Sequence, residues 1–193
     1  MGADKAFVEF DGRTLVARAL EVTRAVTADV RIVGSAEKFA ALAPVVEDVF
    51  RECGPLGGMH AALRASQAGL NLVLAVDMPL VTAKLLRYLI GRAENSSGLA
   101  TVPRGAKGWQ PLCAVYRREF ADAAEKALRA GRYKIDSLFD TVQVQAVEER
   151  DLQAAGFSAG MFRNLNTPRD LAVEETPSGA GGGGRVARGP STA

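Results

Sequence analysis

This sequence of 193 residues has little of several features that would identify particular classes of protein. It has two cysteines and one histidine, and neither Cys53 nor Cys113 has a neighbour at the spacing of a metal site. No apolar run approaches the roughly 20 residues that cross a bilayer. The chain does not open with a basic segment followed by an apolar stretch, as a secretory signal does. We therefore expect reduced thiols and a cytoplasmic protein that does not contact membranes.

An excess of charge of one sign is also lacking. The chain has 24 basic and 22 acidic residues, which gives a net charge of +2. This balance offers no electrostatic basis for a nucleic acid as partner. Hydrophobic residues make up 48% of the chain and charged residues 24%, which is ordinary for a soluble globular protein of one domain.

The most informative stretch is an apolar run, Leu72 to Val76, that ends at Asp77. Such a run predicts a strand buried on both faces, and Pro79 cannot extend a sheet ladder. Asp77 would then lie at the carboxyl end of a buried parallel strand, where open α/β sheets bind their ligands. An acid there either binds metal and substrate or caps the next helix, which we expect to begin near Thr82.

Strands alternate with helices along the rest of the chain, which predicts a mostly parallel α/β sheet. We expect further strands near residues 30–33, 45–47, 99–102, 112–116 and 142–147. We expect helices near residues 14–26, 37–42, 59–68, 82–94, 120–130 and 136–139, with a last helix after Pro168. The stretch 176–193 has six glycines and few large apolar side chains. It is predicted to be a disordered tail.

A glycine-rich segment, Gly54-Pro55-Leu56-Gly57-Gly58, precedes the helix expected at 59–68. Three glycines let a backbone approach a ligand closely, and the helix that follows directs amide donors towards the segment. An ordinary tight loop is the alternative. His60 lies in this helix and is interpreted as structural, because no second histidine or cysteine stands at ligand spacing.

Several stretches taken together resemble one family. Gly2 and Asp4-Lys5 resemble the end of the nucleotidyltransferase signature, and Gln110-Pro111-Leu112 falls where the family has a proline that opens a strand. The other matching stretches are the glycine-rich segment, Val76-Asp77-Met78-Pro79 and Asn164-Leu165-Asn166-Thr167-Pro168. Residues 1–175 therefore resemble the molybdenum cofactor guanylyltransferases, which transfer GMP from GTP to molybdopterin and release pyrophosphate.

The resemblance implies a Rossmann-like three-layer α/β nucleotidyltransferase fold with Mg²⁺ as cofactor. Lys5 and Asp77 would be catalytic, Lys5 by binding the nucleotide phosphates and Asp77 by holding Mg²⁺. Gly2, Asp48 and the glycine-rich segment (Gly54, Pro55, Leu56, Gly57 and Gly58) would bind the nucleotide. Gln110, Asn164 and Asn166 would face the pterin. The expected partners are GTP, molybdopterin and, transiently, molybdenum-cofactor insertion proteins or acceptor enzymes.

The chemistry agrees with these roles. Transfer to a phosphate brings anions together, so cations must offset the charge of the triphosphate and of the leaving pyrophosphate. Mg²⁺ usually takes one or two carboxylates plus phosphate oxygens, and one strand-end aspartate is therefore sufficient. An attacking phosphate that is already ionised needs no general base.

Each role has a structural alternative. Lys5 could be a solvated surface lysine, and Asp48 could cap a turn. Asn164 and Asn166 could only shape the entry to the last helix. Trp109 could line the cleft of the second substrate, although a packed aromatic residue is the favoured interpretation.

The chain also departs from the family pattern. Gly34 stands where the family often has an asparagine, and the family's first strand and its Leu-Ala-Gly-Gly loop have no counterpart. We therefore expect a domain truncated at its amino end, with unpaired strand edges near Val30 and Leu72. Two rival functions remain open. One is a cytidylyltransferase acting on the same pterin, and the other is an inactive binding or scaffold homologue that lost the nucleotide loop.

Overall fold

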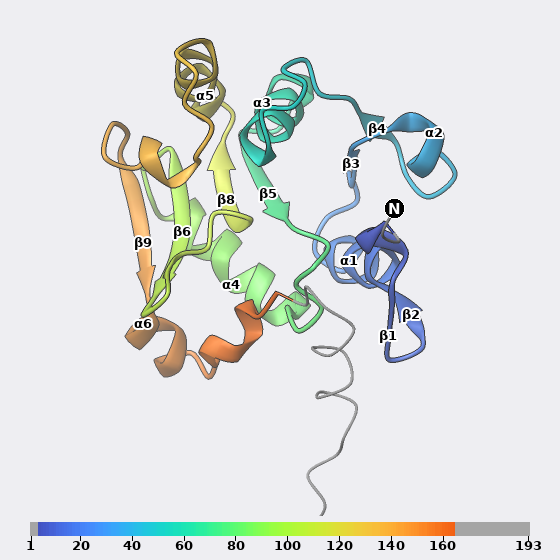
Figure 1. The fold of residues 1–193 in the computed structure, drawn as a ribbon. Helices are drawn as coiled ribbons and strands as arrows, with labels where there is room; N and C mark the ends of the chain where they lie inside the picture. Colours follow the sequence, from blue (N-terminus) through green and yellow to red (C-terminus); the bar gives the residue numbers. More distant parts are fainter. Residues whose placement is uncertain (1–3, 165–193) are drawn as a thin grey trace, which may run out of the picture.

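A five-stranded sheet forms the centre of the computed structural model, which describes residues 4–164 (Figure 1). In spatial order the strands run β5, β8, β6, β7, and β9 pairs with the other edge of β6. Their bounds are β5 Leu70–Leu74, β6 Ala100–Gly105, β7 Gly108–Trp109, β8 Cys113–Arg117 and β9 Val144–Glu148.

This sheet is mixed, and the prediction of a mostly parallel sheet is wrong. β8 is antiparallel to both β5 and β6, β7 is antiparallel to β6, and the one parallel pair described within it is β6 with β9. The physical reason is the short connection between β6 and β8. Parallel neighbours need a crossover of a dozen or more residues, whereas residues 106–112 are too few for such a crossover and turn the chain back.

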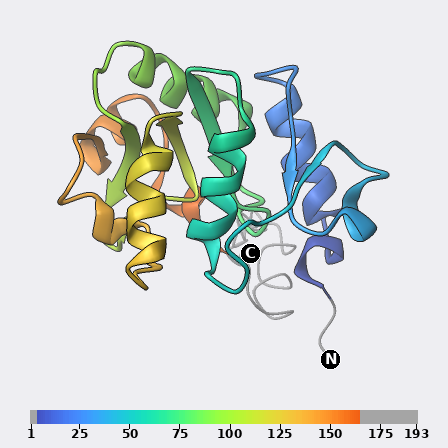
Figure 2. The same ribbon diagram turned by 90° about the horizontal axis from the view of Figure 1, so that it is seen from above.

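Helices cover both faces of this sheet and give three layers. α3 (Pro55–Ala65) and α5 (Phe120–Arg129) lie side by side on one face, and α4 (Ala83–Glu94) lies on the other, as Figure 2 shows. α6 (Glu149–Ala154), which the sequence did not predict, adds to the α4 side through Leu152. Two short helices, η2 (Asp136–Leu138) and η3 (Ala159–Phe162), lie in the same carboxyl-terminal half of the chain.

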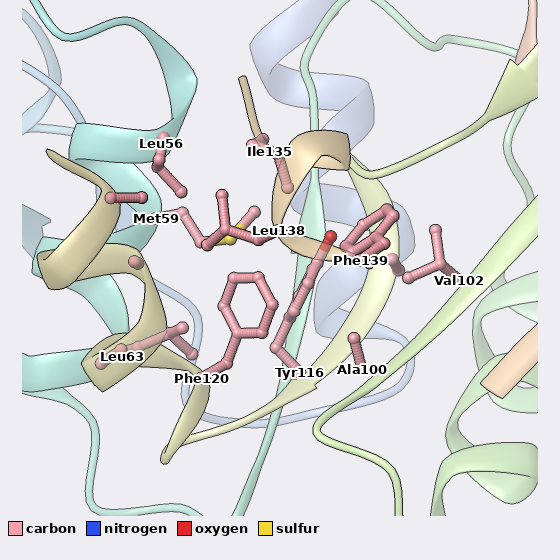
Figure 3. Close-up of a cluster of buried hydrophobic side chains, with 14 of the residues drawn as sticks. Leu56, Met59, Leu63, Ala100, Val102, Tyr116, Phe120, Ile135, Leu138 and Phe139 are labelled. Carbon is pink, nitrogen blue, oxygen red and sulfur yellow. The ribbon is translucent and has the colours of Figure 1, made fainter. Parts of the chain in front are cut away.

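The larger core lies between the α3–α5 layer and the sheet (Figure 3). Phe120 is fully buried, and its ring lies 4.8 Å from that of Tyr116 and 6.5 Å from that of Phe139, centroid to centroid. Leu56 and Met59 of α3 belong to the same cluster. This core therefore fixes the first turns of α3 against the sheet.

The amino-terminal elements form a second group beside β5. They are η1 (Lys5–Phe7), the hairpin β1 (Glu9–Phe10) and β2 (Arg13–Thr14), α1 (Leu15–Arg24), β3 (Ile32–Val33), α2 (Ala36–Phe39) and β4 (Val45–Val46). β3 and β4 pair in parallel as a separate two-stranded sheet. Within residues 4–164, no other strand pairs with β3, and none but β8 pairs with β5.

The expected unpaired edges are therefore present in the described structure. All five residues of β5 are partly exposed, so the prediction of a strand buried on both faces is wrong. A strand with one neighbour leaves its free edge open to solvent. The helix expected after Pro168 and the tail expected from residue 176 lie outside the described residues. None of the helices described is long and apolar enough to cross a membrane.

Candidate functional site

Asp77 lies in the turn after β5, three residues beyond Leu74. The cap of α4 is Thr82, whose Oγ1 accepts a hydrogen bond from the Leu85 amide at 3.3 Å. The helix-cap alternative for Asp77 is therefore wrong. Its side chain is partly exposed, and within residues 4–164 no hydrogen bond or ion pair engages the carboxylate. The carboxylate is thus available to a ligand.

Lys5 lies in η1 and is exposed, and its neighbours Asp4 and Ala6 both contact other parts of the protein. Asp4 accepts a hydrogen bond from the Ala6 amide at 3.2 Å and pairs with Lys38 of α2 at 2.8 Å. This pairing with Lys38 holds the pKa of the Asp4 carboxyl below its ordinary value. Ala6 is buried in one apolar cluster with Val76. The segments that carry Lys5 and Asp77 therefore pack together.

A hollow of about 290 Å³ opens where β3 and β4 end. Its lining residues are Gly34, Ser35, Glu47, Asp48, Arg51 and Glu52. Carboxyl ends of parallel strands are the usual ligand sites of α/β folds. Sequence reasoning singled out Asp48 but missed Arg51 and Glu52. Both residues lie between the end of β4 and the glycine-rich segment, and this position in the sequence could have identified them as candidates for ligand binding.

The carboxylate of Asp48 forms no hydrogen bond or ion pair with residues 4–164. Its Oδ1 is buried and makes no hydrogen bond to any residue described. Burial raises the pKa of this carboxyl. No backbone amide of residues 4–164 donates to Asp48, so the capping alternative is wrong for this residue. The neighbouring Glu47 accepts the Ala36 amide at 3.1 Å. A buried acceptor without a donor is costly, so a ligand that donates to Asp48 would remove an existing penalty.

The glycine-rich segment is mostly helical. α3 begins at Pro55, four residues earlier than predicted, and Gly54 precedes it with φ at +65°. A Cβ on Gly57 would lie 2.6 Å from the Phe50 carbonyl oxygen, and one on Gly58 would lie 2.7 Å from Cγ1 of Val33. These two glycines therefore let β3 and the segment lining the hollow pack directly on α3.

We expect Gly57→Ala to destabilise the protein by about 1–3 kcal/mol, because the new methyl group overpacks against a backbone carbonyl. Gly91→Ala in α4 is the matched control. A Cβ there meets nothing within 4 Å, so this variant should be as stable as the parent or more stable. Thermal unfolding of the two variants side by side measures the difference. Equal melting temperatures would mean that residues 48–53 can shift at no cost.

Two of the residues assigned to the pterin side, Gln110 and Asn164, lie within the described part of the chain. Gln110 follows β7, and its amide donates to the Pro103 carbonyl at 2.9 Å. Asn164 is exposed, just after η3. Leu112 and Phe162, each two residues away from one of them, both pack in the cluster of Met78. The backbone amide of Ala75 also donates to the Leu112 carbonyl at 2.7 Å, which joins the segment after Gln110 to the chain just before Asp77. Gly2 and Asn166 lie outside the described residues.

Two aromatic residues have packing roles. Trp109 meets Phe139 edge to face at 5.0 Å, and the Arg104 guanidinium lies 4.8 Å from its ring centroid. The packed-aromatic interpretation is therefore supported. His60 is buried edge-on against Phe50 at 5.1 Å, with Nε2 3.6 Å from a Glu125 oxygen. Across residues 4–164 no three His, Cys, Asp or Glu side chains gather as a metal site, which agrees with a structural His60.

Comparison with known proteins identifies the family. The model of the MobA-like NTP transferase domain matches residues 1–149. The chain belongs to this family. A probable molybdenum cofactor guanylyltransferase of Pelotomaculum thermopropionicum is 36% identical to this MobA-like chain over 173 residues, which are 89% of this chain and 83% of the relative. The molybdenum cofactor guanylyltransferase of Desulfosudis oleivorans is 30% identical over 182 residues, covering 93% and 90%.

Solved structures agree with this assignment. Molybdopterin-guanine dinucleotide biosynthesis protein A of Archaeoglobus fulgidus superposes with a TM-score of 0.77 at 29% identity and covers 90% of each chain. The 2-C-methyl-D-erythritol 4-phosphate cytidylyltransferase of Thermus thermophilus shares the fold, with a TM-score of 0.66 at 20% identity over 89% of this chain and 92% of that one. The resemblance stated from the sequence is confirmed, as is an α/β nucleotidyltransferase fold.

Proposed function

We propose that this MobA-like protein transfers GMP from GTP to molybdopterin, in its free or molybdenum-loaded form, and releases pyrophosphate. The observation that carries the proposal is the Asp77 carboxylate after β5, which no residue from 4 to 164 engages, in a chain whose relatives at 30–36% identity are named molybdenum cofactor guanylyltransferases. The residues proposed for the nucleotide, Lys5 and Asp48, belong to the amino-terminal elements. The residues proposed for the pterin, Gln110 and Asn164, follow β7 and η3.

The residues at Asp77 suit Mg²⁺. The partly exposed carboxylate has no partner in the described part of the chain, and Mg²⁺ takes one or two carboxylates with its remaining ligands from water and phosphate. When bound, the ion would offset the negative charge of the triphosphate and of the departing pyrophosphate.

The protein's own contribution is to bind and orient. Lys5 would bind the phosphates, Asp48 the nucleoside, and Gln110, Asn164 and Asn166 the pterin. Positioning of two reactants in a fixed geometry supplies much of the rate enhancement of such transfers. The attacking phosphate of molybdopterin is ionised at neutral pH, so no side chain has to remove a proton.

The test is a transfer assay with molybdopterin and Mg²⁺, in which either GTP or CTP is the donor and the dinucleotide product is identified by mass. GTP should give guanine dinucleotide and pyrophosphate in equal amounts. A product from CTP alone would establish the cytidylyltransferase rival. Pterin binding with no product from either nucleotide would establish the scaffold rival.

Lys5→Ala should weaken GTP binding by about 10- to 100-fold, the range expected for a lost charge-assisted hydrogen bond to phosphate. Guanosine binding should change little, because guanosine has no phosphate. Titration calorimetry with both ligands measures the two losses. Lys126→Ala, an exposed lysine of α5, is the control and should alter neither. Equal losses of GTP and guanosine would make Lys5 a structural residue.

A further inference from the structure

The hollow at the ends of β3 and β4 is the right size for one part of a nucleotide. Its volume of about 290 Å³ is near the lower limit for ligand pockets, which begin at roughly 300 Å³. A base or a ribose fits that space better than a whole nucleoside triphosphate. The polar groups that line the hollow then decide which of these it accepts.

Those groups differ in whether they already have a hydrogen-bonding partner in the protein. Glu47 is engaged by the Ala36 amide, and the side chain of Ser35 does not cap α2. Asp48 has a buried Oδ1 that receives no hydrogen bond from any described residue. Arg51 is exposed, and its guanidinium forms no ion pair or hydrogen bond with any residue from 4 to 164. Asp48, an acceptor without a hydrogen-bond donor among residues 4–164, and Arg51, a cationic donor without an acceptor among them, thus line the same hollow. They are three positions apart in the chain.

Guanine matches this pair better than the other bases do. Its Watson–Crick edge offers two adjacent donors, N1–H and N2–H₂, which a carboxylate can accept together. Its O6 and N7 are adjacent acceptors, and a bidentate arginine is their commonest protein partner. Cytosine has a single donor group at N4 beside the N3 acceptor, and adenine presents a donor, N6–H₂, beside N7. Neither base can satisfy both side chains in this way.

We propose that Arg51 is a specificity-determining residue that reads O6 and N7 of guanine in this hollow, while Asp48 accepts from N1–H and N2–H₂. This inference rests on the proposed function, since it deepens the assignment of GTP as donor. Glu52 lies between Arg51 and the glycine-rich segment with a left-handed backbone, φ +60°. This turn leads the lining segment onto Gly54 and α3.

Nucleotide analogues test each half of the pair. On the full chain, calorimetry should show that inosine triphosphate, which lacks N2, and 7-deaza-GTP, which lacks N7, each bind about 10-fold or more weakly than GTP. Arg51→Ala should bind GTP and 7-deaza-GTP equally, and Asp48→Ala, which has no side-chain acceptor, should bind GTP and inosine triphosphate equally. CTP binding should change by less than about 3-fold in both variants. Arg132→Ala, an exposed arginine after α5, is the control.

A thermal melt separates recognition from folding. At pH 7 Asp48→Asn should not lower the melting temperature, because burial raises the pKa of the Asp48 carboxyl and already penalises the ionised form in the folded state. That penalty disappears below a pH of about 4, where the carboxyl is protonated both folded and unfolded. Any advantage of the asparagine variant should therefore be confined to higher pH.

The outcomes distinguish the two proposals. If the parent protein transfers GMP but Arg51→Ala still discriminates against 7-deaza-GTP, Arg51 does not read guanine and the proposed function survives. If Arg51→Ala weakens GTP and CTP by the same factor, its contact is to phosphate or ribose and the inference is wrong. If the parent protein prefers CTP or binds no nucleotide, both proposals fail.

Discussion

Asp77→Asn should lower GMP transfer by at least about 10²-fold, the scale of losing one preorganised electrostatic contact. Asparagine preserves the shape of the side chain but removes its charge and so most of its affinity for Mg²⁺. Stability should hardly change, because within residues 4–164 the carboxylate makes no ion pair or hydrogen bond that the substitution could break. Single-turnover transfer at saturating GTP measures the effect on chemistry.

Asp140→Asn is the matched control. Asp140 is exposed and belongs to none of the segments assigned to substrate or metal binding, so its loss of charge should leave transfer unchanged. Excess Mg²⁺ should recover part of the Asp77→Asn activity if the defect is weak metal binding. Transfer at the parental rate by Asp77→Asn would refute the assignment of this residue as the metal ligand.

The largest loss of stability is expected for Phe120→Ala. Phe120 is fully buried where α5 meets the sheet, and truncation of a core phenylalanine costs about 3–5 kcal/mol. For a chain of this length each kcal/mol lowers the melting temperature by about 2–4 °C, which predicts a fall of about 6–20 °C. Leu56 and Met59 share the cluster, so GTP binding near α3 should weaken as well.

Tyr133→Ala is the control for this prediction, since Tyr133 is 48% exposed and lies outside the clusters. Differential scanning calorimetry of the two variants gives the comparison. A small change for Phe120→Ala would indicate that the neighbouring rings of Tyr116 and Phe139 refill the space.

Local signals predicted the positions of most elements. Thr14 and Thr82 cap the helices that the sequence placed after them, each accepting an amide hydrogen bond at 3.3 Å. The apolar run before Asp77 is a strand, although it ends at Leu74 rather than at Val76. Caps and apolar runs act over a few residues, and they are therefore visible in a single sequence.

Long-range features could not be predicted in the same way. β8 lies between β5 and β6 and is antiparallel to both, because the connection from β6 is short. The general alternation of strands and helices in the sequence favoured a parallel sheet instead. The hollow is another example, because Gly34 and Arg51 come together only when β3 and β4 pair. The packing role of Gly57 needs the Phe50 carbonyl opposite it, which no local pattern reveals.

The separation of the β3–β4 pair from the five-stranded sheet has a consequence for hydrogen exchange. Among the described residues no ladder hydrogen bond joins β3 or β4 to the five-stranded sheet, so side-chain packing and single hydrogen bonds such as that from Arg87 to the Ala25 carbonyl set the spacing between Asp48 and Asp77. A nucleotide held at both residues would bridge the β3–β4 pair and the five-stranded sheet and would oppose their separation. Saturating GTP and Mg²⁺ should then slow amide exchange in β3, β4 and β5 together, by the linkage between ligand concentration and opening free energy.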